Sequence, residues 1–330
     1  MQFVISMSSF EFLGTGENVH PKWGRFKPQN RFNFEQVPLP VVVNLKDTYE
    51  KVGSKRVWVA QNTCGMDKRF CSLLLCFRPA KGQPKPTIIF RGMGKRISAV
   101  EKASWDNRVN VMFQEKAWAD RPVMLEWAEK YFCPYIINEV NGGVNSGEEC
   151  VAFCDNLDSH LTPNFLGLLH AVGCFRFLYP PNCSTEVQAV DAGLGSNTKY
   201  LVGKEFEQWL EIGDNLDRWE NGTLSASDKR IMITRFVGAA WEKIFNDDRY
   251  NPIRYFEKTG SPLTLDGSDD DKVCIEGLPN YSPPKVGPVS QATPAPTSLE
   301  VESGGGETED MSEDVDEAEG DIIQEGDVLR

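Results

Sequence analysis

Two aspartates that follow apolar segments are the residues of this sequence best suited to chemistry. Asp155 comes directly after the uncharged run CVAFC (150–154), which is typical of a strand buried on both faces. Polar residues just beyond such a strand lie where α/β sheets place their sites. Asp191 offers a second carboxylate, and carboxylates that folding brings together can bind a divalent metal ion. This pair favours a nuclease-like chain.

The negative charge of the chain is concentrated in its last part. The 330 residues carry a net charge of −13, but residues 261–330 hold eighteen acidic and three basic residues. The first 260 residues therefore hold 30 acidic and 32 basic residues, a net charge of +2. The overall acidity consequently does not exclude DNA binding by the folded part. A hydrophobic content of 40% is ample for a core, and the length allows two domains or one domain with appendages.

The cysteines and the lack of long apolar segments point to an intracellular protein. Nine cysteines at irregular spacings favour free thiols in a reducing compartment. The pairs Cys71/Cys76 and Cys150/Cys154 lack the histidine partners of a zinc site. The first residues do not form a secretory signal, and no segment has the roughly 20 apolar residues that span a bilayer.

The first part of the chain reads as strands joined by short connections. The segments 31–40, 56–61, 70–77 and 87–90 are predicted strands, and residues 79–84 have the composition of a hairpin loop. Because consecutive strands with short connections pair antiparallel, we expect this half of the sheet to be largely antiparallel.

The second part alternates helices with strands. Asp120 predicts the N-cap of one helix, and Thr162 predicts the N-cap of another. The predicted strands 150–155 and 174–179 flank that second helix, which makes a βαβ unit with a parallel strand pair. Amphipathic helices are then expected over residues 201–210 and 229–245.

This order of elements matches a ribonuclease-H-like core, and six motifs add a resemblance to a known family. The segment from about residue 18 to 281 resembles the catalytic region of pogo/Tigger/jerky-like transposases, DDE superfamily endonucleases related to mariner elements. The motifs are RFNFEQVPLP (31–40), TYEKVGSKRVWVA (48–60), PTIIFRGMGKRI (86–97), FQEKAWADRPVMLEW (113–127), CDNLDSHLT (154–162) and YPPNCSTEVQAVDAGLG (179–195).

The resemblance implies a catalytic set of three carboxylates. Glu35, Asp155 and Asp191 fall on the three metal-ligand positions of the family, and 35 residues separate the two aspartates. Such a set can hold two Mg²⁺ or Mn²⁺ ions about 4 Å apart, and the implied activity is cleavage and joining of DNA phosphodiesters. Where the family has Asp at the first position this chain has Glu35, and where it usually has Pro this chain has Ala189. The resemblance begins near residue 18, so we expect this chain to lack the helix-turn-helix module with which the family reads DNA.

Each of these residues also has an ordinary structural interpretation. Asp155 could be a turn residue and Asp191 a helix cap, while Glu35 fits either a working ligand or the mark of lost activity. Asp158 is interpreted as a turn residue, and His160 as a neighbour of the site or an ordinary loop histidine. The alternative function is accordingly a catalytically inactive transposase remnant that binds nucleic acid or protein.

A basic stretch is the candidate contact with the DNA backbone. Residues 78–102 have a net charge of +6, which could follow a phosphate backbone or simply protect a solvated hairpin edge. The residues proposed for this contact are Lys81, Lys85, Arg91, Lys95 and Arg96.

The sequence predicts four parts and two kinds of partner. Residues 1–17 form a leader, 18–212 the catalytic domain, 213–282 a helical extension and 283–330 a disordered acidic tail. DNA is the expected partner, no membrane is involved, and a homodimer is left open. The family implies residence in the nucleus.

Overall fold

The computed structural model describes residues 20, 22–40, 70–140, 148–179, 187–261, 264, 267–275, 278 and 280–282. These residues belong to one compact unit, Met1–Gly287. The predictions for the leader, for the strand at 56–61 and for the acidic tail lie outside the described residues.

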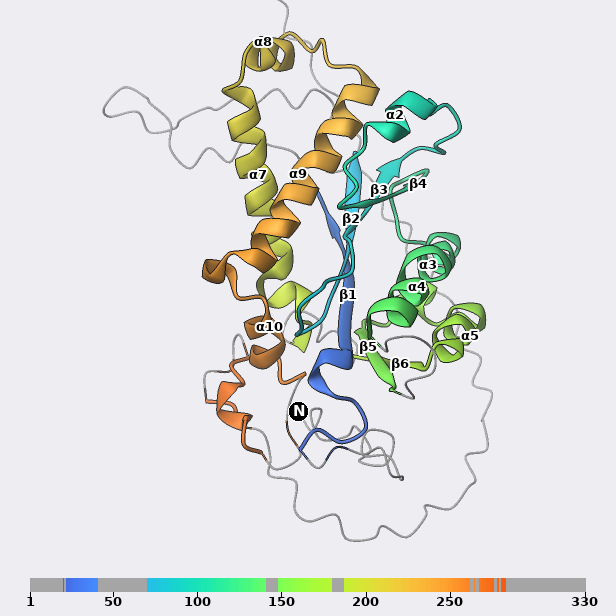
Figure 1. The fold of residues 1–330 in the computed structure, drawn as a ribbon, viewed down its shortest axis with the longest axis vertical. Helices are drawn as coiled ribbons and strands as arrows, with labels where there is room; N and C mark the ends of the chain where they lie inside the picture. Colours follow the sequence, from blue (N-terminus) through green and yellow to red (C-terminus); the bar gives the residue numbers. More distant parts are fainter. Residues whose placement is uncertain are drawn as a thin grey trace, which may run out of the picture. The chain divides into compact units, whose positions relative to one another are not determined.

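A six-stranded mixed sheet forms the centre of this unit (Figure 1). Its order is β4-β3-β2-β1-β5-β6, and β2 is antiparallel to both of its neighbours while all other pairs are parallel. The predicted fold class, a ribonuclease-H-like mixed sheet flanked by helices, is confirmed. The strands are β1 (Arg31–Pro38), β2 (Cys71–Phe77), β3 (Thr87–Arg91), β4 (Asn110–Gln114), β5 (Cys150–Cys154) and β6 (Cys174–Leu178).

The directions of the strands define one functional end of the sheet. Since only β2 runs the opposite way, the other five strands all finish at the same end, which we call the carboxyl end. Residues that follow these strands can therefore meet there, as in other α/β sheets.

Strand β4 was not expected from the sequence, and it makes the first half of the sheet less antiparallel than predicted. It lies parallel to β3 at the edge of the sheet. The connection between them, residues 92–109, contains the short helix α2 (Ala99–Ala103) and is long enough for a crossover between parallel strands.

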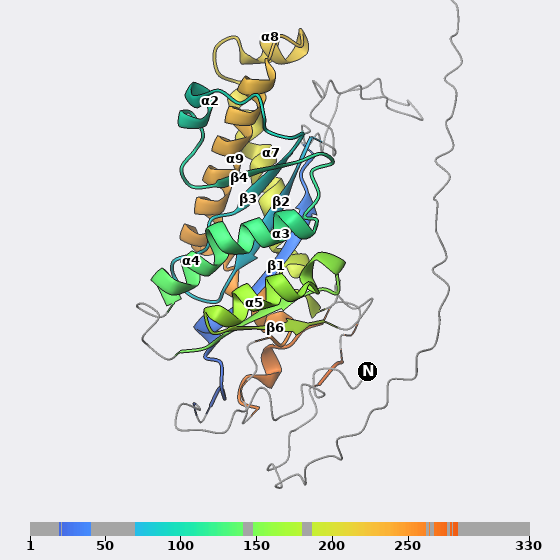
Figure 2. The same ribbon diagram turned by 90° about the vertical axis from the view of Figure 1, so that its right-hand side faces the viewer.

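Helices cover both faces of the sheet, as Figure 2 shows with α3, α4 and α5 in front and α7 and α9 behind. On the first face, α3 (Arg121–Trp127), α4 (Cys133–Tyr135) and α5 (Pro163–Ala171) pack on β1 through Phe32 and Phe34. The predicted caps are present, because Asp120 accepts a hydrogen bond from Val123 N and Thr162 accepts one from Phe165 N.

The second face is covered by α7 (Gly195–Leu210) and α9 (Ala226–Asn246), with α8 (Asn215–Glu220) and α10 (Ile253–Lys258) beside them. Ser225 caps α9 through a capping box with Asp228. Val237 and Ala240 of α9 are buried in one core with Leu75 and Phe77 of β2. The helical extension predicted for 213–282 thus shares its core with strands of the predicted catalytic part.

Two further observations concern the helices and the cysteines of the described part. None of its helices is long and apolar enough to cross a bilayer. The cysteines described by the structure are free, and all except Cys274 are buried.

Candidate active site

Two of the three predicted carboxylates occupy matching positions on neighbouring parallel strands: Glu35 lies within β1, and Asp155 directly follows β5. Asn33 of β1 pairs with Phe153 of β5, and Glu35 and Asp155 each lie two residues further on. Side chains two residues apart point to the same face of a sheet, so both carboxylates belong to the face covered by α7. Phe34, next to Glu35, is buried against the helices of the other face.

Asp191 reaches this place on the single helical turn Val190–Leu194, which leads into α7. The turn is anchored to the sheet because Val190 N donates a hydrogen bond to Asn33 Oδ1 at 2.8 Å. Asn33 Nδ2 in turn donates to Phe153 O at 3.0 Å. The buried Asn33 side chain therefore ties together the three segments that carry the carboxylates.

The three carboxylates influence one another electrostatically. The pKa of Glu35 is raised to about 8, first by burial and then by the charge of Asp155, with a smaller contribution from Asp191; a hydrogen bond from Gln188 opposes the shift. Partial removal from water also raises the pKa of Asp191, where Lys199 acts against the shift and Asp155 adds to it. Glu35, Asp155 and Asp191 thus lie close enough for their charges to interact, and we refer to them as the acidic site.

Asp155 is the member of the set whose pKa is lowered. Burial acts to raise its pKa, but hydrogen bonding to His160 and the charge of that ring outweigh burial, so that the pKa is lowered. His160 Nδ1 lies 2.8 Å from Asp155 Oδ1, and Leu157 N donates to the same oxygen at 3.2 Å. Asp155 therefore combines the turn role with a place in the acidic site. The buried His160 ring is held against Phe34 in an edge-to-face contact.

Asp158, the other aspartate of this loop, is engaged elsewhere. Both of its carboxylate oxygens accept hydrogen bonds at 2.5 Å from Arg121 at the start of α3. This exposed ion pair fastens the loop after β5 to the first turn of α3.

Gln188 and Asn33 are site residues that the sequence did not single out. Gln188 is fully buried, and its Nε2 donates a short hydrogen bond to Glu35 Oε2. Its Oε1 is buried without a hydrogen-bond partner. The only signal in the sequence was position, since Gln188 lies three residues before Asp191 and Asn33 two before Glu35.

The donor atoms of this site suit a hard divalent cation. As the side chains stand, no group of three or more His, Cys, Asp and Glu residues in the described part is arranged to hold a metal ion. The oxygens of Glu35, Asp155 and Asp191 are nevertheless the donors that Mg²⁺ and Mn²⁺ prefer. The unpartnered Gln188 Oε1 beside Glu35 adds a neutral oxygen that lacks a donor. We conclude that the residues fit such an ion in their chemistry.

The predicted basic residues lie at two ends of the sheet. Arg91 is the last residue of β3, at the carboxyl end, and Lys95 and Arg96 follow it on the exposed loop. Lys81 and Lys85 precede β3 and therefore lie at the opposite end.

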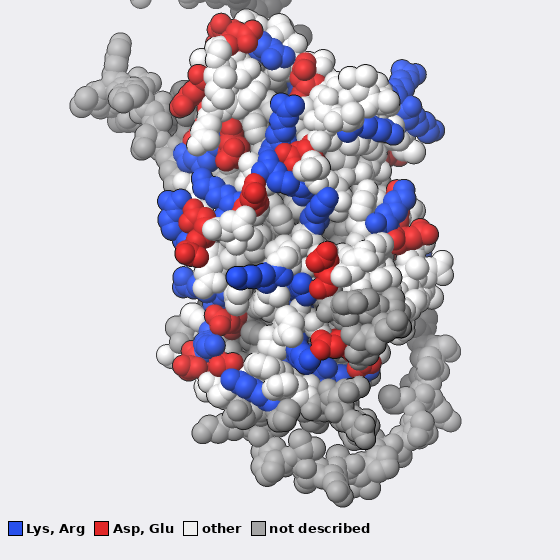
Figure 3. Space-filling model, in the orientation of Figure 1, with Lys and Arg blue, Asp and Glu red and all other residues white. Residues whose placement is uncertain are grey.

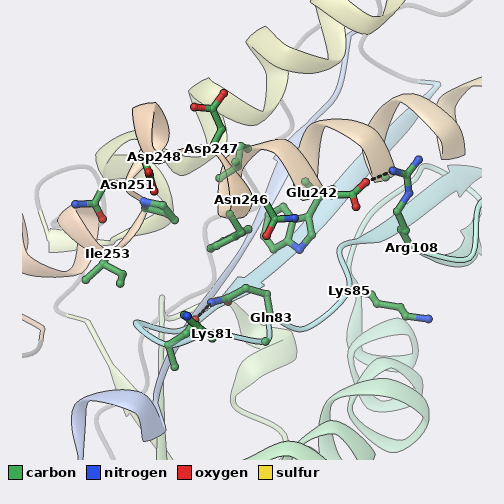
Figure 4. A pocket seen from close by; sticks show the side chains of 17 residues that line it. Lys81, Gln83, Lys85, Arg108, Glu242, Asn246, Asp247, Asp248, Asn251 and Ile253 are labelled. Atoms are coloured by element: carbon green, nitrogen blue, oxygen red, sulfur yellow. Dashed lines mark hydrogen bonds and ion pairs between the residues drawn. The ribbon is translucent and has the colours of Figure 1, made fainter.

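Lys81 and Lys85 line a cavity of about 930 Å³ between the β2–β3 connection and the end of α9 (Figure 4). Trp241 also lines it, and its Nε1 donates to Pro84 O at 3.1 Å. An ion pair of Arg108 with Glu242 lies at its rim. Basic and acidic side chains are interspersed over the face seen in Figure 3, so this face carries no uniform positive patch.

Comparison with known proteins places the chain in a family. A solved structure that resembles it is the Mos1 transposase paired-end complex with left transposon end, at 11% sequence identity and a TM-score of 0.36. That match covers 67% of this chain and 56% of the other, so the chain spans little more than half of that protein's length. The family model of the DDE superfamily endonuclease matches residues 67–248, more than half of the chain; it includes Asp155 and Asp191, whereas Glu35 lies before it. The chain therefore belongs to the DDE superfamily of endonucleases.

Proposed function

We propose that this protein is a transposon-derived, metal-dependent DNA endonuclease of the pogo/Tigger/jerky-like branch. The observation that carries the proposal is that the Asn33 side chain joins the three segments that carry the carboxylates, close enough for Asp155 to raise the pKa of both Glu35 and Asp191. Neighbouring like charges disfavour ionisation, and a bound proton or cation relieves their repulsion.

In this proposal Glu35, Asp155 and Asp191 hold two Mg²⁺ or Mn²⁺ ions. Such ions supply activation of water or of a 3′-hydroxyl and stabilisation of the leaving oxygen of a phosphodiester. The residues around them have positioning roles. His160 holds the Asp155 carboxylate through its Nδ1 contact, and Asn33 fixes the turn of Asp191 against β5.

Contacts with DNA are proposed for the basic residues. Arg91, Lys95 and Arg96 are close in the chain to the carboxyl end of β3 and would meet phosphates near the acidic site. Lys81 and Lys85 lie at the opposite end of β3 and would touch a more distant part of a bound duplex. Action on chromosomal DNA would place the protein in the nucleus, which imaging of a fluorescent fusion can test.

A second candidate is a catalytically inactive module that still binds nucleic acid or protein. One observation favours it: the first ligand position holds Glu35 instead of Asp, and Gln188 already occupies one oxygen of that carboxylate. A longer side chain shifts the carboxylate by about 1 Å, and misplacement of this size can lower a rate about 100-fold.

Nicking of supercoiled plasmid by the purified full chain, with Mg²⁺ or Mn²⁺, separates the two candidates. If the protein is an active endonuclease, the natural chain nicks and Asp155→Asn abolishes nicking. Asp158→Asn is the matched control, since Asp158 lies in the same loop but pairs with Arg121. Nicking by Glu35→Asp alone, with none by the natural chain, would establish the inactive module instead.

A further inference from the structure

The loop between β4 and α3 presents a tryptophan to solvent. The side chain of Trp118 is 60% exposed, whereas Ala117 and Ala119 on either side of it are buried. An indole buries a large apolar surface when it finds a partner. Its exposure between two buried residues leaves this surface available for a contact with another molecule.

This loop is held rigidly by the strand that carries Glu35. Gln36 donates to Ala117 O and accepts from Ala119 N, both at 2.9 Å, and Ser72 Oγ donates to Ala117 O at 2.6 Å. Ala117 has a φ of 59°, a left-handed conformation that costs a residue with a Cβ about 1 kcal/mol or more. The backbone on both sides of Trp118 is thus fixed, and so is the place where the indole emerges.

Trp118 emerges at the carboxyl end of the sheet on the face covered by α3, because the side chains of Gln36 and Ser72 that hold its loop point to that face, opposite to the one to which Glu35 points. Gln36 is the residue after Glu35 on β1. Three residues after Trp118, Arg121 pairs with Asp158 of the loop that begins at Asp155. That loop has two more exposed apolar side chains, Leu157 at 38% and Leu161 at 42%.

The surroundings of Trp118 match the chemistry of a nucleic acid whose bases are accessible. The exposed Glu115 and Lys116 lie three and two residues before it, and Arg91 ends strand β3, the neighbour of β4, at the same end of the sheet. Cations that follow a backbone, interleaved with aromatic and apolar groups, are the usual arrangement for single-stranded nucleic acid. In a duplex the faces of the bases are stacked on one another, so an indole could reach only the edges.

We propose that Trp118 is the centre of a subsite that stacks on an unpaired nucleobase of the DNA strand entering the acidic site. The subsite rests on the proposed function in one respect, that its ligand is DNA. It adds that the DNA strand is unpaired where it passes the end of β1. It does not depend on whether the acidic site is catalytically active.

The test is fluorescence anisotropy with a labelled short single strand and with the duplex of the same sequence, in EDTA so that no cleavage occurs. Stacking is worth about 1–3 kcal/mol per base, so Trp118→Ala should weaken binding of the single strand roughly tenfold and change duplex binding less than about twofold. Trp118→Phe should keep most of the affinity. Ile212→Ala is the matched control, because Ile212 is similarly exposed, at 63%, but lies at the end of α7.

Several results would overturn the subsite. One is unchanged single-strand binding by Trp118→Ala; another is an equal loss for single strand and duplex. A change from dimer to monomer in sedimentation by Trp118→Ala, with single-strand binding unaffected, would assign the indole to a second copy of the chain. Metal-dependent nicking tests the proposed endonuclease and not the subsite. A chain that never nicks, but whose preference for single strands depends on Trp118, would contradict the proposed endonuclease and leave the subsite in place.

Discussion

Glu35 should make the stability of the metal-free protein fall as the pH rises. Its pKa in the folded chain is about 8, against an ordinary value of 4.5, because of burial and the neighbouring Asp155 and Asp191. The folded state therefore binds the Glu35 proton more tightly than the unfolded state does. The resulting contribution to the free energy of unfolding is fully present below about pH 4.5 and is lost as the pH rises to about 8.

The size of the effect follows from the shift. Each pKa unit corresponds to about 1.4 kcal/mol, so the full loss is on the order of 5 kcal/mol as an upper value. Glu35→Gln keeps the shape of the side chain but cannot ionise. Its free energy of unfolding, relative to the natural chain, should therefore increase by up to about 1.4 kcal/mol per pH unit and level off above about pH 8.

Urea unfolding followed by tryptophan fluorescence, without metal and at several pH values from about 5 to 9, measures this difference. Asp158→Asn is the control, because Asp158 pairs with Arg121 and does not contribute to the pKa of Glu35. Hydrogen bonding to Arg121 lowers the pKa of Asp158 from its ordinary 3.8, so its contribution to stability is lost only in acid and its difference should stay flat above about pH 5. A constant difference for Glu35→Gln across the whole range would show that Glu35 does not share a buried site with the two aspartates.

Three further outcomes are expected. Asn33→Ala removes two buried hydrogen bonds and should lower the free energy of unfolding by about 2–4 kcal/mol in urea titrations; a loss of only a few tenths would refute its bridging role. Gly193→Ala places a Cβ 2.3 Å from Tyr255 Cε1 and should lower the melting temperature well below that of Gly213→Ala, which has open space at a φ of 57°; equal losses would contradict this packing. Gln188→Met removes the hydrogen bond to Glu35 together with the unpartnered Oε1, so calorimetry should show Mn²⁺ binding weakened roughly tenfold; unchanged affinity would count against a role of this amide in holding the ion.

Local features of the fold were predictable from the sequence because their interactions span few residues. The cap of α3 is a hydrogen bond from Val123 N to Asp120, three residues away. The strands β5 and β6 and the helix α5 between them lie in one short stretch of the chain. Their parallel crossover could therefore be predicted without knowing the rest of the chain. The position of Asp155 just past an apolar strand was readable for the same reason. The resemblance to a DDE endonuclease, which the family match confirms, supplied Asp191 and Glu35.

Only the tertiary structure decided how these residues act together, because that depends on contacts between segments far apart in the chain. The register between β1 and β5 brings Glu35 beside Asp155 and raises its pKa, and no local pattern encodes that pairing. Gln188 gained its role through a contact with Glu35 across the fold. The basic residues of the stretch 78–102 fall into two groups, because residues before and after β3 lie at opposite ends of the sheet. Residue types and spacing thus indicated which groups could do chemistry, whereas strand pairing determined which of them share a site.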